Sequence, residues 1–167
     1  MMRKILTFAL PMAGCALLIA AQGAIAAGPA KEGSFDSMSC YAGPQHVITD
    51  GRSTVGFSYD VVGTPMRKEG DPLYHASAEC VGSGTIAGAE SMESGLCVFT
   101  DPDGDRFFSA YSVRNKEPGT WKTIAGTGKF EGMEASGTWA RVLAPDKPAR
   151  TDIAQSCDKE TGHWKLK

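Results

Sequence analysis

The residues of this sequence that could do chemistry are few. Asp101, Asp103 and Asp105 alternate along one short segment, a pattern shared with calcium-binding loops because hard cations take several carboxylate ligands. The segment departs from the EF-hand pattern, with Arg106 in place of the glycine at position six and Ser112 in place of the glutamate at position twelve. A hairpin turn whose aspartates accept hydrogen bonds from backbone amides fits better, and a weak surface calcium site is the alternative.

Candidate catalytic residues are equally sparse. The chain has no Gly-x-Ser-x-Gly nucleophile motif, and its three histidines, His46, His75 and His163, are far apart in sequence. Glu79 is the most interesting acid because it lies in the middle of a predicted strand. If it points into a closed barrel, it becomes a candidate general acid or a polar contact for a ligand. A solvent-facing position is favoured, because charged residues are mostly exposed. The sequence therefore favours a non-catalytic protein over an enzyme.

No cofactor motif has the required spacing. The run GTGK at residues 126–129 is similar to a phosphate-binding loop, but Glu131 replaces the third glycine of the dinucleotide fingerprint. Phe130 stands where a P-loop needs Ser or Thr. The net charge is −2, and no cluster of Lys and Arg is interleaved with aromatic residues, which argues against nucleic-acid binding. We therefore expect no cofactor and no nucleic-acid partner.

Aromatic residues are frequent in the segments predicted to be strands, and most of them must belong to the core. The candidate ligand-binding residues among them are Tyr59, Tyr111, Trp121 and Trp139. The pattern alone does not separate core side chains from side chains that line a pocket.

The cysteines indicate disulfides. Apart from Cys15, the chain has Cys40, Cys80, Cys97 and Cys157, an even number that suits a protein of an oxidising compartment. No pair has the C-x-x-C spacing, and no histidine lies near two of them, so zinc is disfavoured. Four cysteines allow three connectivities. We favour Cys80–Cys97 within one hairpin and Cys40–Cys157 between the chain ends.

Residues 1–26 have the composition of a cleavable export signal. A basic start precedes the apolar residues 5–21, and a small-x-small cleavage site follows at residues 24–26. The apolar run is too short and too interrupted for a membrane span, so we expect no transmembrane helix in the mature chain. The alternative is a lipoprotein signal ending at Cys15, although the chain stays apolar after that residue. The expected location is periplasmic or secreted.

The elements that must position these residues are predicted to be strands. The 167 residues include 20 glycines and nine prolines, which leave few uninterrupted stretches long enough for a helix. Alternation of apolar and polar residues with a period of two predicts half-buried strands. The expected strands are Thr54–Val62, Leu73–Val81, Gly95–Thr100, Asp105–Val113, Thr120–Ala125 and Ala135–Leu143, with weaker candidates at Gln45–Thr49 and Thr85–Gly88.

The two ends of the mature chain have a different composition. Residues 27–39 are polar and rich in Gly and Ser, and are predicted to be a flexible lead-in. The tail from Pro145 is polar and is predicted to hold one short helix at residues 151–157. Residues 40–167 are then a single all-β domain. Its many short antiparallel strands must close into a barrel, or alternatively fold over as a β-sandwich, to bury their edges.

Two motifs carry a resemblance to a known family. The segment WKTIAGTGKFEG at residues 121–132, followed by SGTW at 136–139, resembles the glycine-rich hairpin of allene oxide cyclase-like and dirigent-like β-barrels. The CxxxDPDGD segment at residues 97–105 is similar to a hairpin of small exported bacterial proteins of unknown function. The resemblance implies an antiparallel barrel of about eight strands. It transfers no functional residue, because the pocket residues of those families do not map onto this chain.

The leading functional interpretation is an exported, non-catalytic β-barrel. It would bind a small apolar or amphipathic ligand in its lumen, or a partner in the cell envelope at its rim. One alternative is a cyclase-like or isomerase-like enzyme with its active site in the lumen. Another is an envelope interaction or inhibitor protein that acts through the loop at residues 101–105 or 126–132. The sequence leaves the oligomeric state open.

Overall fold

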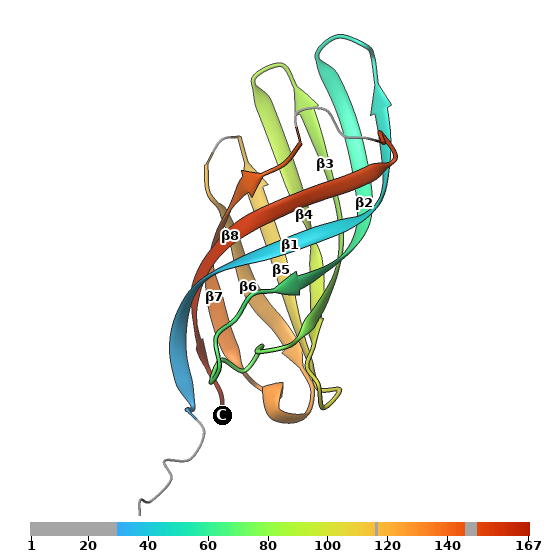
Figure 1. Cartoon of the computed structure of the whole chain (residues 1–167). Coiled ribbons are helices and arrows are strands. Elements are labelled where there is room, and N and C mark those ends of the chain that lie inside the picture. Colours follow the sequence, from blue (N-terminus) through green and yellow to red (C-terminus); the bar gives the residue numbers. More distant parts are fainter. Residues whose placement is uncertain (1–29, 116, 146–149) are drawn as a thin grey trace, which may run out of the picture.

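The fold is a closed antiparallel β-barrel of eight strands (Figure 1). The structure is a computed structural model and describes residues 30–115, 117–145 and 150–167. Each strand pairs with the next one along the chain, and the last strand pairs with the first. The predicted fold class is therefore confirmed, and the barrel forms instead of the sandwich.

The strands are long and their connections are mostly short. Their bounds are β1 Glu32–Thr49, β2 Thr54–Pro65, β3 Ser77–Ala87, β4 Glu90–Thr100, β5 Arg106–Arg114, β6 Gly119–Gly126, β7 Glu134–Leu143 and β8 Ile153–Lys165. A single turn of 3₁₀ helix, η1 (Gly128–Phe130), lies between β6 and β7.

The two ends of the described chain correct the prediction. Most of the expected flexible lead-in is the first part of β1, and the expected helix at residues 151–157 is the start of β8. These strands pair from Glu32 opposite Lys165 to Pro44 opposite Ile153 and so close the barrel. Many of their inward positions carry polar or small residues. The sequence of these two strands therefore lacks the regular apolar positions by which a strand is recognised.

One predicted strand is shifted along the chain. Leu73 and Ala76 are buried in the connection between β2 and β3, and β3 begins only at Ser77. These two buried apolar residues made the loop look like the start of a strand in the sequence. In the structure their side chains cover the barrel interior. The weak strand candidate at residues 85–88 is the end of β3, and the one at residues 45–49 is the end of β1.

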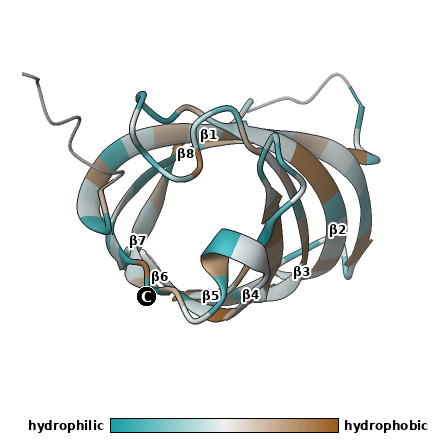
Figure 2. Ribbon diagram, turned by 90° about the horizontal axis from the view of Figure 1, so that it is seen from below, coloured by the Kyte–Doolittle hydropathy of each residue, from teal (hydrophilic) through white to brown (hydrophobic). Residues whose placement is uncertain are grey.

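The most buried core residues lie toward one end of the barrel. Figure 2 shows the barrel from below. Phe99 on β4 and Phe107 on β5 pack there with ring centroids 5.5 Å apart. Phe130 of η1 is fully buried, and Met133 beside it is 5% exposed. The β6–β7 connection therefore contributes apolar side chains to the core. Phe99, Phe107 and Met133 also line the space that remains in the lumen.

Both predicted disulfides are present. Cys80–Cys97 joins β3 to β4 on the inward face, where both residues are buried. Cys40–Cys157 joins β1 to β8, the pair of strands that closes the barrel. Two disulfides are typical of proteins from oxidising compartments.

Among the described residues, no helix has the length and apolar character that crossing a membrane requires. The predicted export signal at residues 1–26, with Cys15, lies outside the described residues.

Candidate functional site

The barrel encloses a cavity that is lined mainly by aromatic and apolar side chains. The space open to the centres of water-sized molecules is about 90 Å³. A single water needs about 10–15 Å³ on this measure, so the lumen has room for several waters or a small organic molecule. Apolar lining residues include Phe35, Val61, Phe99, Phe107, Trp121 and Trp164, and the Cys80–Cys97 disulfide also lines the cavity.

All four residues predicted to bind a ligand line this cavity: Tyr59, Tyr111, Trp121 and Trp139. Tyr59 on β2 and Tyr111 on β5 meet with their hydroxyl oxygens 2.5 Å apart. The Trp139 ring lies edge-on to Tyr111, with centroids 6.0 Å apart. The fold thus brings together four side chains that are far apart in sequence, and their contact with a ligand stays a prediction.

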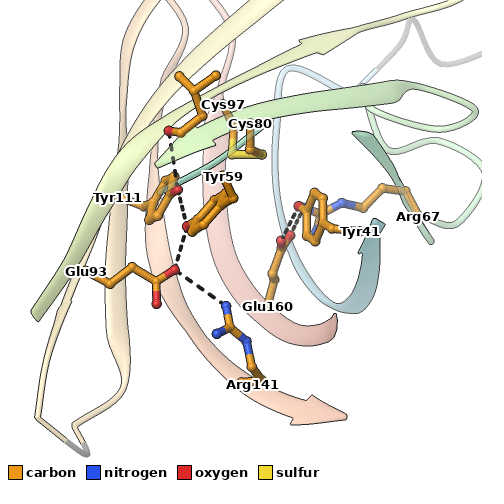
Figure 3. Close-up of a disulfide and its surroundings, with 10 residues drawn as sticks. Tyr41, Tyr59, Arg67, Cys80, Glu93, Cys97, Tyr111, Arg141 and Glu160 are labelled. Carbon is orange, nitrogen blue, oxygen red and sulfur yellow. Dashed lines mark hydrogen bonds and ion pairs between the residues drawn. A yellow bond between two sulfur atoms is a disulfide. The ribbon is translucent and has the colours of Figure 1, made fainter. Parts of the chain in front are cut away.

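A polar cluster, the Tyr59–Asp158 cluster, crosses the lumen; its members are Tyr59, Glu93, Tyr111, Arg141 and Asp158. The Tyr59 hydroxyl donates to Glu93 Oε1 at 2.5 Å (Figure 3). Arg141 Nη2 lies 3.5 Å from the same oxygen, and Arg141 Nε donates to Asp158 Oδ1 at 3.2 Å. Glu93 is on β4 and Asp158 on β8, which are opposite in a closed barrel of eight strands. The cluster therefore spans the interior from wall to wall.

Burial changes the acidity of this cluster. It raises the pKa of Tyr59 strongly, with the negative charge of Glu93 adding to the effect. Burial likewise raises the pKa of Tyr111 to about 12. The pKa of the Asp158 carboxyl is raised by burial, and the positive charge of Arg141 only partly opposes this shift. Both phenols are therefore neutral hydrogen-bonding groups at physiological pH.

A second polar cluster consists of Arg67, Tyr41 and Glu160. Arg67 comes from the β2–β3 connection, and its Nη2 pairs with Glu160 Oε2 at 3.0 Å. The Tyr41 hydroxyl donates to Glu160 Oε1 at 3.0 Å (Figure 3). Burial raises the pKa of the Glu160 carboxyl, although the Arg67 charge opposes it, and burial also raises the pKa of Tyr41. The Arg67 Cζ atom lies 3.4 Å above the centre of the Phe35 ring.

Glu79 does not take part in these clusters. Its side chain is exposed, because successive residues of a strand face opposite sides and Cys80 faces the lumen. Glu79 therefore has the solvent-facing position that the sequence favoured, and it is not an acid of the lumen. The carboxylates that line the cavity are those of Asp71, Glu93, Asp158 and Glu160. Sequence reasoning missed all four. Asp158 and Glu160 lie in the segment interpreted as a polar tail, and the available signal there was the period of two that relates Asp158, Glu160 and Trp164.

The aspartate segment forms a turn that is tied to the neighbouring loop. Asp101 Oδ1 accepts hydrogen bonds from the backbone N–H groups of Asp103 and Asp105, both at 2.9 Å. The Lys129 ammonium pairs with Asp101 and lies 3.3 Å from Asp103 Oδ2, while Asp105 Oδ2 accepts the Lys129 backbone N–H at 3.0 Å. The cation beside these carboxylates is thus Lys129. In the described part of the chain, no group of three or more His, Cys, Asp or Glu is arranged to hold a metal ion.

This cluster joins the two motifs of the resemblance. The CxxxDPDGD segment provides the aspartates, and the GTGKF segment provides the lysine that neutralises them. The three histidines are exposed, and His163 Nε2 lies 3.4 Å from Ser136 Oγ.

No protein-family model matches the sequence, and no curated protein matches it either. Among solved structures, the chain is similar to the pterocarpan synthase dirigent protein PsPTS1, with 11% sequence identity, a TM-score of 0.48, and coverage of 81% of this chain and 96% of that chain. For the pterocarpan synthase dirigent protein GePTS1 the identity is 12%, the TM-score 0.47, and the coverage 82% and 93%. Neither likeness assigns a function to this chain.

Proposed function

We propose that this protein is an exported, non-catalytic β-barrel that binds a small apolar or amphipathic ligand in its lumen. The observation that carries the proposal is the cavity of about 90 Å³ inside the barrel, with aromatic walls and two polar clusters. Ligand sites in proteins commonly combine apolar and aromatic walls with a few placed polar groups. Export is supported by the predicted signal at residues 1–26 and by the two disulfides.

The chemistry of the lining favours an amphipathic ligand. Phe35, Trp121 and Trp164 offer apolar surface, and removal of such surface from water stabilises the complex by about 25 cal/mol per Å². Tyr59 and Tyr111 offer neutral hydroxyl groups that fix the orientation of a polar atom. An eight-stranded barrel is wide enough to hold one small ligand.

The test is a pair of leucine substitutions on the same strand. Ser109 on β5 is 4% exposed and lines the cavity, whereas Ser112 on β5 is exposed on the outer surface. Ser109→Leu fills the lumen and Ser112→Leu leaves it open. Native mass spectrometry of protein purified from its own host should show a bound small molecule on the wild type and on Ser112→Leu, and none on Ser109→Leu.

Circular dichroism confirms that each variant is folded before the masses are compared. A ligand that stays on folded Ser109→Leu would place the binding site outside the lumen and contradict the proposal. A wild-type protein that carries no small molecule, and takes up none from an extract of the host, would contradict it as well.

A cyclase-like or isomerase-like activity is the second candidate, favoured by the carboxyl groups in the cavity. Burial raises the pKa of Asp158 and Glu160, so each keeps its proton to a higher pH than an exposed carboxyl does, as general acids in enzymes do. The ligand that co-purifies with Glu160→Gln distinguishes the two functions. The same compound on both proteins supports binding alone, whereas an accumulated precursor on the variant supports catalysis.

A further inference from the structure

Arg67 is a deeply buried cation whose hydrogen-bonding capacity is only partly used. Its side chain is 2% exposed, and its Nη2 atom pairs with Glu160. Within the described part of the chain, its Nε and Nη1 atoms have no hydrogen-bond partner, and both are shielded from solvent. A guanidinium carries five N–H donors, and leaving buried donors unpaired is unfavourable. An acceptor atom placed against these free N–H groups would therefore stabilise the folded protein.

The free donors lie beside an aromatic surface that lines the cavity. The Arg67 guanidinium stacks on Phe35, and the Phe35 ring stacks on Trp121 with centroids 5.8 Å apart. The Trp121 indole N–H also lacks a partner among the described residues, and all three residues line the same cavity. This part of the lumen thus matches an acceptor atom that is attached to an apolar body.

The charges of the cavity restrict that acceptor further. Among the described residues that line it, carboxylates outnumber guanidinium groups. The carboxylates are those of Asp71, Glu93, Asp158 and Glu160, and the guanidinium groups are those of Arg67 and Arg141. Both arginines are already paired with these carboxylates. In an interior of low dielectric constant, an added anion meets this negative excess with little screening. A ligand carboxylate or phosphate is therefore disfavoured, and a ligand cation makes no use of the free donors of Arg67.

We propose that the lumen takes a neutral, largely apolar molecule whose carbonyl or ether oxygen accepts hydrogen bonds from Arg67, with its apolar body beside Phe35 and Trp121. This inference rests on the proposed ligand-binding function and names the chemical class of the ligand. The apolar body provides most of the affinity, and the oxygen atom fixes the orientation. A hydrocarbon of the same shape lacks the acceptor, and a carboxylate of the same shape has the wrong charge.

Four one-ring probes of similar size separate these classes: acetophenone, ethylbenzene, benzoate and benzylamine. Each is titrated into the folded, ¹⁵N-labelled protein while the Arg67 Nε–H and Trp121 indole signals are followed by NMR. Acetophenone should bind about tenfold more tightly than ethylbenzene, the effect of a hydrogen bond from a charged donor. It should shift both signals, and benzoate should bind more weakly than ethylbenzene.

Arg67→Lys tests the donor directly. The lysine keeps a cation for Glu160 but has no group in place of Nε and Nη1. The tenfold preference for acetophenone should disappear in this variant, while ethylbenzene binds as before. Arg114→Lys is the matched control, because Arg114 is exposed at the end of β5. This control should keep the preference.

The wild-type titrations decide the question even if Arg67→Lys does not fold. Equal binding of acetophenone and ethylbenzene in the lumen would overturn the inference and leave the ligand-binding function in place. Tightest binding of benzoate or benzylamine would overturn the charge argument and with it the proposed class. If no probe shifts a lumen signal, both the inference and the proposed function fail.

Discussion

Tyr41, Tyr59 and Tyr111 place three phenol groups in an interior where ionisation is unfavourable. Burial raises the pKa of each of them, and that of Tyr111 to about 12. The folded state therefore keeps protons that the unfolded chain releases near pH 10. Because the folded state then binds more protons than the unfolded state, the free energy of unfolding decreases as the pH rises above about 10.

An alkaline titration checks this difference. The chain has four tyrosines, so Tyr74→Phe leaves only the three in the lumen. We expect this variant to show little phenolate absorbance at 295 nm at pH 11 while it is folded, and full phenolate absorbance in urea. Near-UV circular dichroism reports whether the fold persists. Equal titration curves for the folded and unfolded protein would contradict the assigned burial.

Lys129 is a second residue whose ion pair contributes to stability. Its ammonium faces the Asp101 carboxylate, which is fully buried, while the Lys129 side chain itself is 40% exposed. Lys129 and the backbone N–H groups of Asp103 and Asp105 outweigh the effect of burial and lower the pKa of Asp101. Removal of Lys129 leaves a buried carboxylate without its cation, although water can reach part of the vacated space.

We therefore expect Lys129→Met to lower the free energy of unfolding by about 1–3 kcal/mol near neutral pH. Because a group with a lowered pKa stabilises the folded state only when it is ionised, this loss should shrink as the pH falls and Asp101 becomes protonated. Urea unfolding at pH 7 and pH 3 measures both values. Lys122→Met, at an exposed position of β6, is the control and should change little. A loss that is equal at both pH values would refute the pairing.

At the scale of the strands, glycines make room for rings that lie flat on the barrel wall. A Cβ atom on Gly95 would lie 2.2 Å from the Tyr111 hydroxyl oxygen and 2.2 Å from the Val81 carbonyl oxygen. A Cβ atom on Gly119 would lie 2.1 Å from Trp139 Nε1. These glycines belong to strands β4 and β6, so they are not turn residues. Their missing side chains set the positions of the rings that line the cavity.

Two alanine substitutions test this role of glycine. Gly95→Ala should lower the free energy of unfolding by about 1–3 kcal/mol, because the new methyl group displaces Tyr111 or the β3 backbone. Gly56→Ala, on β2, adds a methyl group where nothing lies within 4 Å. That variant should be unchanged or more stable by about 0.5–1 kcal/mol, since alanine has less conformational freedom to lose on folding. Chemical denaturation of both variants measures the contrast, and equal effects would contradict it.

At the scale of the whole molecule, the two disulfides close loops of very different length. Cys40–Cys157 links residues 117 positions apart and joins the strands that close the barrel, whereas Cys80–Cys97 links residues 17 positions apart within one hairpin. In the chain-entropy model the longer loop is worth about 5 kcal/mol and the shorter about 3 kcal/mol. The difference arises in the unfolded chain, which is freer to expand without the longer bridge.

We therefore expect Cys40→Ala/Cys157→Ala to lose about 2 kcal/mol more stability than Cys80→Ala/Cys97→Ala. Thermal and urea unfolding of the two double variants measure this difference, and ligand binding provides a second readout. Only the second variant changes a wall of the cavity, because Cys80 and Cys97 line it. If the hairpin variant is the less stable of the two, packing in the lumen outweighs chain entropy.

Much of this architecture was predictable from local pattern. Alternation over residues 54–62 and 105–113 identified two strands. The even number of cysteines indicated disulfides, and the structure has the favoured one of the three possible pairings. The prediction failed where inward positions are polar. Ser37, Ser39, Asp158 and Glu160 face the lumen, so β1 and β8 lack the apolar alternation on which such predictions depend.

The sequence by itself determined the all-β class and most of the strands, because these follow from period-two patterning and from the spacing of glycine and proline along the chain. It favoured the disulfide pairing and the four aromatic candidates without excluding the alternatives. Only the tertiary structure decided which carboxylates face inward and which cations meet them. Glu93 and Arg141 come from strands β4 and β7, and Arg67 and Glu160 are 93 positions apart. Barrel closure sets those encounters, since the pairing of β1 with β8 fixes which side chains share the lumen.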